Sequence, residues 1–182
     1  ALSRMAAALG KAEDALYFSA RSLGYRRYYN RESGTLRPLL PDGTFLSPFN
    51  PCQGENFAPC PGFHEGSAWN YTFSQAYDVK GLARLMGGPK AYVKKLQHVF
   101  DASLFDPTNE PDMVYPYLFS LFKGEAWRTQ QLTRRLLHKH FTDRPDGLPG
   151  NDDTGTMSAW ALFSMLGFYP YCPGNPEYIL TA

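Results

Sequence analysis

Residues 150–167, GNDDTGTMSAWALFSMLG, join an acidic turn bounded by glycines to a segment whose side chains recur at helical intervals. This spacing predicts a helix over 154–167 with one packing face. The residues of that face are Met157, Trp160, Ala161 and Ser164. The same arrangement, a polar loop followed directly by a helix, recurs along the chain and indicates an all-α fold.

Helical patterns cover most of the sequence, and the stretches that alternate as a strand should are short. The predicted helices are 1–29 (one helix, or two short ones broken at Gly10), 66–78, 79–87, 89–103, 113–123, 125–141 and 154–167. Pro89 suits a first helical turn, where its missing N–H is not needed. Strand-like runs occur only around 44–49 and 177–181.

The connections between these helices are long at alternate junctions. Residues 30–62 hold much of the proline and glycine, and a loop of this length usually has a function of its own. A plain helical bundle would explain the helices but not such loops. We therefore predict an all-α fold in which antiparallel helix pairs form part of an α/α toroid, with the loops at one end building a pocket.

The composition excludes several classes of protein. A net charge of +1 over 182 residues, without a long basic tract, gives no reason to expect nucleic-acid binding. No apolar run is long enough to span a membrane, and no signal peptide is visible. We expect the chain to continue at both ends. Cys52 and Cys60 could form a disulfide or remain free thiols, and the sequence lacks the cysteine and histidine spacing of a zinc site.

Acidic segments stand immediately before three of the predicted helices. They are Phe63-His64-Glu65-Gly66-Ser67-Ala68-Trp69, Thr108-Asn109-Glu110-Pro111-Asp112 and Gly150-Asn151-Asp152-Asp153-Thr154-Gly155. Any one of them is explained by helix capping, since such side chains satisfy free N–H groups in a first turn. The turn at 150–155 holds more acid and amide than a cap can use. Its adjacent carboxylates need a cation, a proton or a polar ligand nearby.

Glycoside hydrolysis is a reaction that requires such carboxylates. One acid protonates the leaving oxygen while a second carboxylate activates water on the opposite face of the sugar. Glu65 has aromatic neighbours in sequence and suits the acid, whereas Asp153 lies in a polar loop and suits the base. Asparagine, glutamate and aspartate oxygens also suit a hard cation such as calcium. The residues alone indicate a two-carboxylate hydrolase with possible metal assistance.

Other residues allow a functional and a structural interpretation. Trp69 could stack on a sugar ring or belong to the core, and His64 could contact substrate or simply lie exposed at a helix entry. Asp78 is most simply a helix N-cap.

Three stretches resemble the motifs of glycoside hydrolase family 92, the calcium-dependent inverting α-mannosidases. They are GFHEGSAWNYTFSQAYDVKGLARLMGG at 62–88, NEPDMVYPYLFSLFKGEAWRTQ at 109–130, and PGNDDTGTMSAWALFSMLGFYPYCPGNPEYIL at 149–180. The resemblance implies an N-terminal β-sandwich joined to an (α/α)6 barrel. Residues 1–182 would then be the second half of the barrel, with the sandwich and the first half upstream, in a secreted or periplasmic protein.

The resemblance also implies roles for individual residues. Glu65 would be the general acid, Asp153 the base with Asp152 or Asn151 assisting, and Asn109, Glu110 and Asp153 the calcium site. Trp69, His64 and Asn151 would contact substrate. Many family members follow NEP with a serine and histidines, whereas this chain has Asp112-Met113-Val114-Tyr115, so we leave linkage specificity open.

The resulting expectation is an exo-acting α-mannosidase. It would hydrolyse terminal α-1,2-linked mannose of glycans, including glycoprotein glycans, by single-displacement inversion with Ca²⁺. One alternative is an α/α-barrel glycosidase of different sugar or linkage specificity. The other is a non-catalytic helical carbohydrate-binding module, against which the retention of Glu65, Asp152 and Asp153 argues.

Overall fold

The computed structural model describes residues 1–54 and 62–181, and helices dominate this part of the chain. The α-helices are α1 (Leu2–Ala8), α2 (Ala12–Ser22), α3 (Ala68–Thr72), α4 (Val79–Leu85), α5 (Pro89–Asp101), α6 (Ala126–His140) and α7 (Thr156–Leu166). The 3-10 helices are η1 (Gly24–Arg27), η2 (Ala76–Asp78), η3 (Glu110–Asp112) and η4 (Tyr115–Leu121). The predicted all-α class is confirmed, and none of the described helices is long and apolar enough to cross a membrane.

The strands are only two residues each. β1 (Tyr29–Asn30) pairs antiparallel with β2 (Thr35–Leu36), and β3 (Phe168–Tyr169) pairs with β4 (Ile179–Leu180). Tyr29 lies opposite Leu36 in the first pair, and Phe168 lies opposite Leu180 in the second. These short pairs close loops rather than form a layer.

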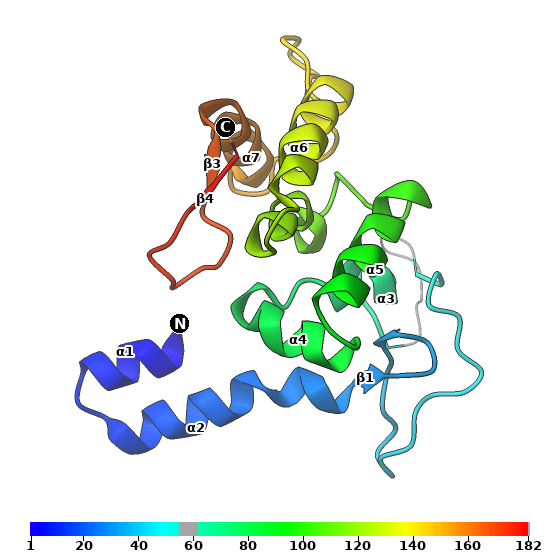
Figure 1. Ribbon diagram of the computed structural model, residues 1–182, viewed down its shortest axis with the longest axis vertical. Helices are drawn as coiled ribbons and strands as arrows, with labels where there is room; N and C mark the ends of the chain where they lie inside the picture. Colours follow the sequence, from blue (N-terminus) through cyan, green and yellow to red (C-terminus); the bar gives the residue numbers. More distant parts are fainter. Residues whose placement is uncertain (55–61, 182) are drawn as a thin grey trace.

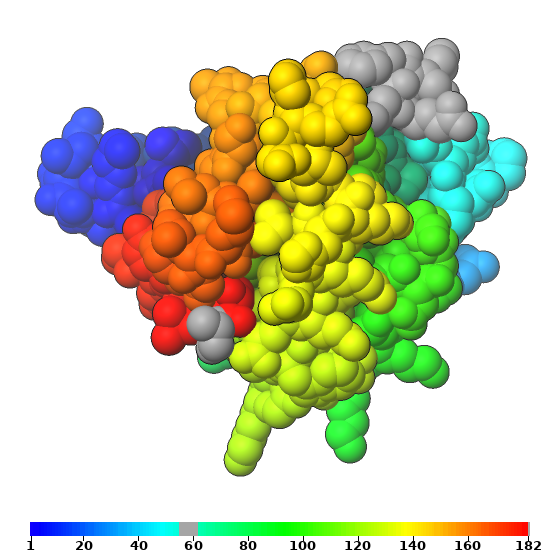
Figure 2. All heavy atoms as spheres, turned by 90° about the horizontal axis from the view of Figure 1, so that it is seen from above, coloured from blue at the N-terminus to red at the C-terminus, as the bar shows by residue number. Residues whose placement is uncertain are grey.

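Consecutive helices contact each other as pairs, α1 with α2, α4 with α5, and α6 with α7 (Figure 1). The α1–α2 hairpin projects to one side of the molecule (Figure 2, blue). Its helices show the predicted break at Gly10, and their larger apolar side chains are exposed. These side chains are Leu2, Met5, Leu9, Leu16 and Tyr17.

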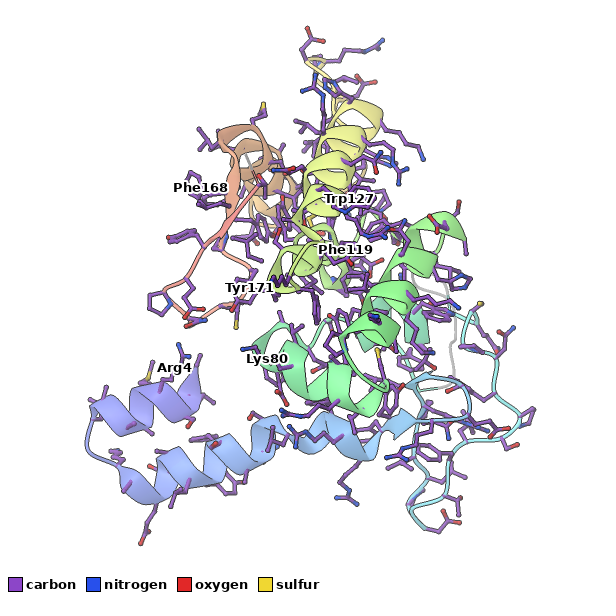
Figure 3. The ribbon with its side chains drawn as sticks, in the orientation of Figure 1. Arg4, Lys80, Phe119, Trp127, Phe168 and Tyr171 are labelled. Atoms are coloured by element: carbon purple, nitrogen blue, oxygen red, sulfur yellow. The ribbon has the colours of Figure 1, made fainter. Side chains whose placement is uncertain are left out.

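The core forms where η4 packs among the helices, and Phe119 lies near its centre (Figure 3). The ring of Phe73, which ends α3, meets the rings of Tyr92 of α5 and Tyr115 of η4 edge to face, with centroids 5.1 and 5.5 Å apart. All of these side chains are fully buried. This aromatic cluster fixes α3 against the segment that follows the NEP motif.

Some predicted elements differ from the structure. The α-helix predicted over 113–123 is instead the 3-10 helix η4, in which Tyr115 to Phe119 are all buried, so burial on every side replaces an amphipathic face. The helix predicted over 66–78 is α-helical only over α3. The run at 44–49 contributes only an isolated bridge between Phe45 and Leu39. The Cys52–Cys60 pairing involves Cys60, which lies outside the described residues.

Candidate active site

The loop that carries Glu65 is held in an unusual backbone conformation. Glu65 has φ 53° and the following Gly66 has φ 153°, and a non-glycine residue in the left-handed region costs free energy that the surroundings must supply. Ser67 then caps α3, because its N–H and hydroxyl both donate to the Asn70 side-chain oxygen at 2.7 Å. The Glu65 carboxylate is 35 % exposed, and its Oε1 lies 3.3 Å from Nε2 of His64.

The second loop contacts the first directly. The buried Asn109 side chain donates from Nδ2 to the backbone carbonyl of Glu65 at 2.5 Å, while its Oδ1 accepts the Glu110 N–H at 3.2 Å. The Glu110 carboxylate is exposed and has no hydrogen-bond partner among the described residues. Asn109 therefore fixes the backbone of the candidate acid, and Glu110 remains available to a ligand.

The third loop gives its two aspartates different environments. Both carboxylate oxygens of Asp152 accept from Ser158, one from its N–H and one from its hydroxyl, each at 2.8 Å. These bonds lower the pKa of Asp152 and tie the acidic turn to the first turn of α7, whose N-cap is Gly155. Asp153 has φ 42°, and its carbonyl accepts the Thr156 hydroxyl at 2.7 Å. Its carboxylate has no hydrogen-bond partner within the described ranges.

All three loops meet at one end of the helices. A pocket of about 480 Å³ is lined by Glu65, Asn109 and Glu110 and by Thr156, whose hydroxyl donates to the Asp153 carbonyl. Asp152 and Asp153 are not among its described lining residues. A Cβ atom at Gly150 would lie 3.0 Å from Cβ of Thr108, so the acidic turn and the NEP loop touch there. Tyr169 and Tyr171 line the same pocket from the β3–β4 end, and Figure 3 shows Tyr171 on the side that faces η4.

Asp112, which in the sequence marks the departure from the common motif after NEP, is a buried carboxyl group behind the pocket. Oδ2 of Asp112 accepts from Nδ2 of Asn70 at 2.9 Å and from the Asp106 N–H at 2.7 Å. Burial raises the pKa of Asp112 to about 8. The hydroxyl of Tyr115 donates to the backbone carbonyls of Trp69 and Asn70. The segment after NEP thus supports the Glu65 loop from the core, a function that polarity in sequence does not reveal.

The remaining predicted substrate contacts lie in different places. Trp69 is 8 % exposed and its ring meets His98 of α5 edge to face, outside the residues that line the pocket. This position favours the packing interpretation that the sequence left open. The His64 side chain is 84 % exposed and contacts the Glu65 carboxylate. Asn151 is exposed at the start of the acidic turn. Asp78 accepts the Gly81 N–H at 3.0 Å, which confirms it as an N-cap.

The donor chemistry around the pocket suits a hard cation only in part. Within residues 1–54 and 62–181, no group of three or more acidic, histidine or cysteine side chains gathers in a metal-binding arrangement. Glu110 supplies a carboxylate, Asn109 an amide oxygen and Glu65 a backbone carbonyl, all near one another. Calcium accepts all three kinds of oxygen, with water or sugar hydroxyls completing its coordination.

Known proteins resemble the chain in both sequence and structure. An α-mannosidase of family GH92 from Bacteroides thetaiotaomicron, solved with mannoimidazole, superposes with a TM-score of 0.88 at 30 % identity, over 97 % of this chain and 25 % of its own. An inverting mannosidase of the same family and organism superposes with a TM-score of 0.81 at 28 % identity, over 98 % of this chain and 27 % of its own.

A curated relative from Arthroderma benhamiae, described as an uncharacterized secreted glycosidase, is 26 % identical over 179 residues, which is 94 % of this chain and 22 % of the relative. The chain thus spans about a quarter of the length of these proteins. The model of the glycosyl hydrolase family 92 catalytic domain matches residues 1–182. The chain therefore belongs to glycoside hydrolase family 92, as part of its catalytic domain.

Proposed function

We propose that this chain forms part of the active site of an exo-acting α-mannosidase that hydrolyses terminal α-1,2-linked mannose of glycans with inversion. The observation that supports the proposal is that Glu65, Asn109 and Glu110 line one pocket with Thr156, whose hydroxyl donates to the Asp153 carbonyl. Structures of mannosidases in the same family support the choice of mannose. We also propose a secreted or periplasmic location, and the description of the fungal relative as a secreted glycosidase supports export.

Each carboxylate has an environment that suits one role. Glu65, the proposed acid, lies on a backbone anchored by Asn109 and protonates the glycosidic oxygen. Asp153, the proposed base, keeps its carboxylate free of other described partners and takes a proton from the attacking water. Asp152 is occupied by its two bonds from Ser158 and assists by holding the turn. We expect a separation of about 6.5–9.5 Å between the carboxyl groups of Glu65 and Asp153, which leaves room for that water.

We propose Ca²⁺ as the cofactor, held by Glu110 and Asn109 with Asp153 nearby. When bound, it supplies a Lewis acid for the sugar hydroxyls. The side chains of this chain keep the tasks of proton transfer and orientation. The family neighbours also support a larger architecture, in which residues 1–182 form the second half of an (α/α)6 barrel.

The proposal is tested in the full-length protein with Glu65→Gln and Asp153→Asn. Each change removes one proton-transfer group, and we expect turnover of an α-1,2-mannobioside to fall by about 10²–10⁴-fold. NMR of the first-formed product should show the β-anomer. Glu13→Gln and Asp143→Asn, at exposed positions, serve as matched controls.

Undiminished activity in both site variants would refute the assignment of acid and base. An α-anomeric first product would refute inversion alone. Wild-type protein that binds mannosides without hydrolysing them would favour the non-catalytic binding module, and hydrolysis of another sugar or linkage would favour the other alternative.

A further inference from the structure

The segment from the NEP motif into η4 carries polar side chains at intervals of three residues. They are Asn109, Asp112 and Tyr115. η3 and η4 are 3-10 helices, in which side chains three residues apart lie one above another, and Met113 and Val114 between them also have right-handed helical backbone. The three polar side chains therefore form one row along this segment.

Each member of the row contacts a different part of the segment that carries the candidate acid. Asn109 donates to the backbone carbonyl of Glu65 itself. Asp112 accepts from the side chain of Asn70, near the middle of α3. Tyr115 contacts the backbone of the last turn of α3. The row thus holds the acid loop at its start and holds the following helix at its middle and at its end.

The Tyr115 hydroxyl holds the end of α3 through backbone groups. It accepts the Phe73 N–H at 3.1 Å and donates to the Trp69 carbonyl at 2.9 Å, and the Asn70 carbonyl shares the same proton. α3 is five residues long, and carbonyls in a last turn have no partner within the helix. Tyr115 is fully buried, and burial raises the pKa of its hydroxyl well above the usual value, so the hydroxyl keeps its proton and both donates and accepts.

A shift of α3 would reach the acid directly, because Gly66 and Ser67 alone separate Glu65 from the helix. A general acid must lie within about 2.6–3.2 Å of the oxygen that it protonates. A displacement of about 1 Å can lower the rate by about a hundredfold. We propose that Tyr115 is a positioning residue for Glu65, because its hydroxyl fixes α3 and α3 fixes the loop of the acid; this rests on the function proposed above.

Tyr117 offers a matched control on the same 3-10 helix. Its side chain is also fully buried, and its hydroxyl lies 2.6 Å from Oγ of Ser164 on α7. Tyr115→Phe and Tyr117→Phe each remove one buried, hydrogen-bonded hydroxyl and leave an aromatic ring in the core. Only the first change removes a bond to α3, so a role in packing alone predicts the same outcome for both.

The test compares these variants of the full-length protein on two substrates. The leaving oxygen of an α-1,2-mannobioside needs a proton, whereas the fluoride ion of α-mannosyl fluoride departs with little help from an acid. For Tyr115→Phe on the mannobioside we expect kcat to fall by about tenfold, with KM within about twofold of wild type. Its kcat on the fluoride should stay within about twofold of wild type. Glu65→Gln should show the same selectivity with a larger fall, and Tyr117→Phe should match wild type on both substrates.

An equal fall of kcat on both substrates in Tyr115→Phe, or no fall on either, would overturn the positioning role. The same selective fall in Tyr117→Phe would also overturn it. Retained turnover of the fluoride reports that Tyr115→Phe is folded, and Tyr115→Met gives the same comparison if the phenylalanine variant does not accumulate. Undiminished mannobioside turnover in Glu65→Gln would refute the proposed acid and the positioning role with it, which separates the two failures.

Discussion

The side-chain amide of Asn70 donates a 2.9 Å hydrogen bond to the buried carboxyl group of Asp112. The side-chain oxygen of Asn70 also accepts the Ser67 N–H in the loop after Glu65. The same Asp112 oxygen accepts the N–H of Asp106, which precedes Asn109 in the second loop. One oxygen atom therefore joins the loop of the candidate acid to the loop of the candidate cation ligands. The position of both loops depends on an interaction that lies outside the pocket.

Because one Asp112 oxygen accepts both bonds, two substitutions at Asp112 should have different effects on stability. Alanine removes the acceptor and leaves two buried donors unpaired, so we expect a loss of about 2–4 kcal/mol in the free energy of unfolding. Asparagine keeps an acceptor oxygen in place, and we expect a loss of no more than about 1 kcal/mol. Urea unfolding of the full-length variants measures both. Equal losses would show that the acceptor oxygen does not matter.

Substitutions of the two aspartates in the acidic turn should have different effects, one mainly on stability and the other mainly on catalysis. Asp152→Ala removes the two bonds from Ser158 in the first turn of α7, and we expect a loss of about 0.5–2 kcal/mol in unfolding free energy with part of the activity retained. Asp153→Asn should leave the melting temperature nearly unchanged while turnover collapses. Thermal melts and initial rates on the same preparations decide this. The reverse pattern would exchange the roles assigned to these residues.

How far the sequence predicts the structure depends on the range of each interaction. Local signals predicted the break at Gly10, the first turn at Pro89 and the Asp78 cap, because each is decided by nearby backbone. They did not predict the 3-10 form of η4 or the role of Asp112. The burial of η4 comes mainly from its packing against α6, and the role of Asp112 comes from its bond to Asn70 of α3. Sequence patterns do not show which residues meet across the core.

In the candidate site, too, the sequence predicted the local features and missed the contacts between distant segments. The motif around Glu65 identified the loop, but its left-handed backbone and its bond to Asn109 required coordinates. Aromatic neighbours in sequence suggested an apolar setting for Glu65. In the structure Trp69 and Phe73, one helical turn apart, share the face of α3 that points into the core, and Glu65 lies before the helix begins.

A pH dependence is expected from Asp78. Burial alone would raise its pKa, but hydrogen bonds from Arg26 at 2.7 Å and Tyr25 at 2.8 Å outweigh burial and lower it. A carboxyl group whose pKa is lower in the folded state stabilises above its unfolded pKa of about 3.9, and this contribution is lost as pH falls further. Asp78→Asn should therefore cost about 1–2 kcal/mol at pH 7 and progressively less below about pH 4. Unfolding free energies of the wild type and the variant, measured at several pH values, give the cost of the substitution at each pH. A cost that does not change with pH would contradict the prediction.

Calcium removal should act through Glu110. We expect a chelator to abolish turnover and lower the melting temperature of the full-length protein, with recovery on added Ca²⁺. Glu110→Gln should weaken Ca²⁺ binding by about tenfold in calorimetry, because a charged ligand becomes neutral. Glu13→Gln, far along the chain on α2, should bind as wild type does. Full activity after complete calcium removal would refute the metal role and leave the proposed acid and base untouched.

The exposed apolar side chains of the first two helices predict how the 182-residue chain behaves alone. Leu16 is 73 % exposed and Leu2 56 %, on a hairpin that projects from the remaining helices (Figure 1). If further parts of a barrel cover this face in the full-length protein, the isolated chain should melt without a sharp transition and show no turnover. Leu16→Glu should then improve the solubility of the isolated chain but destabilise the full-length protein by about 2–3 kcal/mol, since it would place a charge where an apolar side chain is buried. A cooperative melt with measurable turnover from the isolated chain, or a Leu16→Glu variant that leaves full-length stability unchanged, would show that this face is solvent-exposed in the working enzyme.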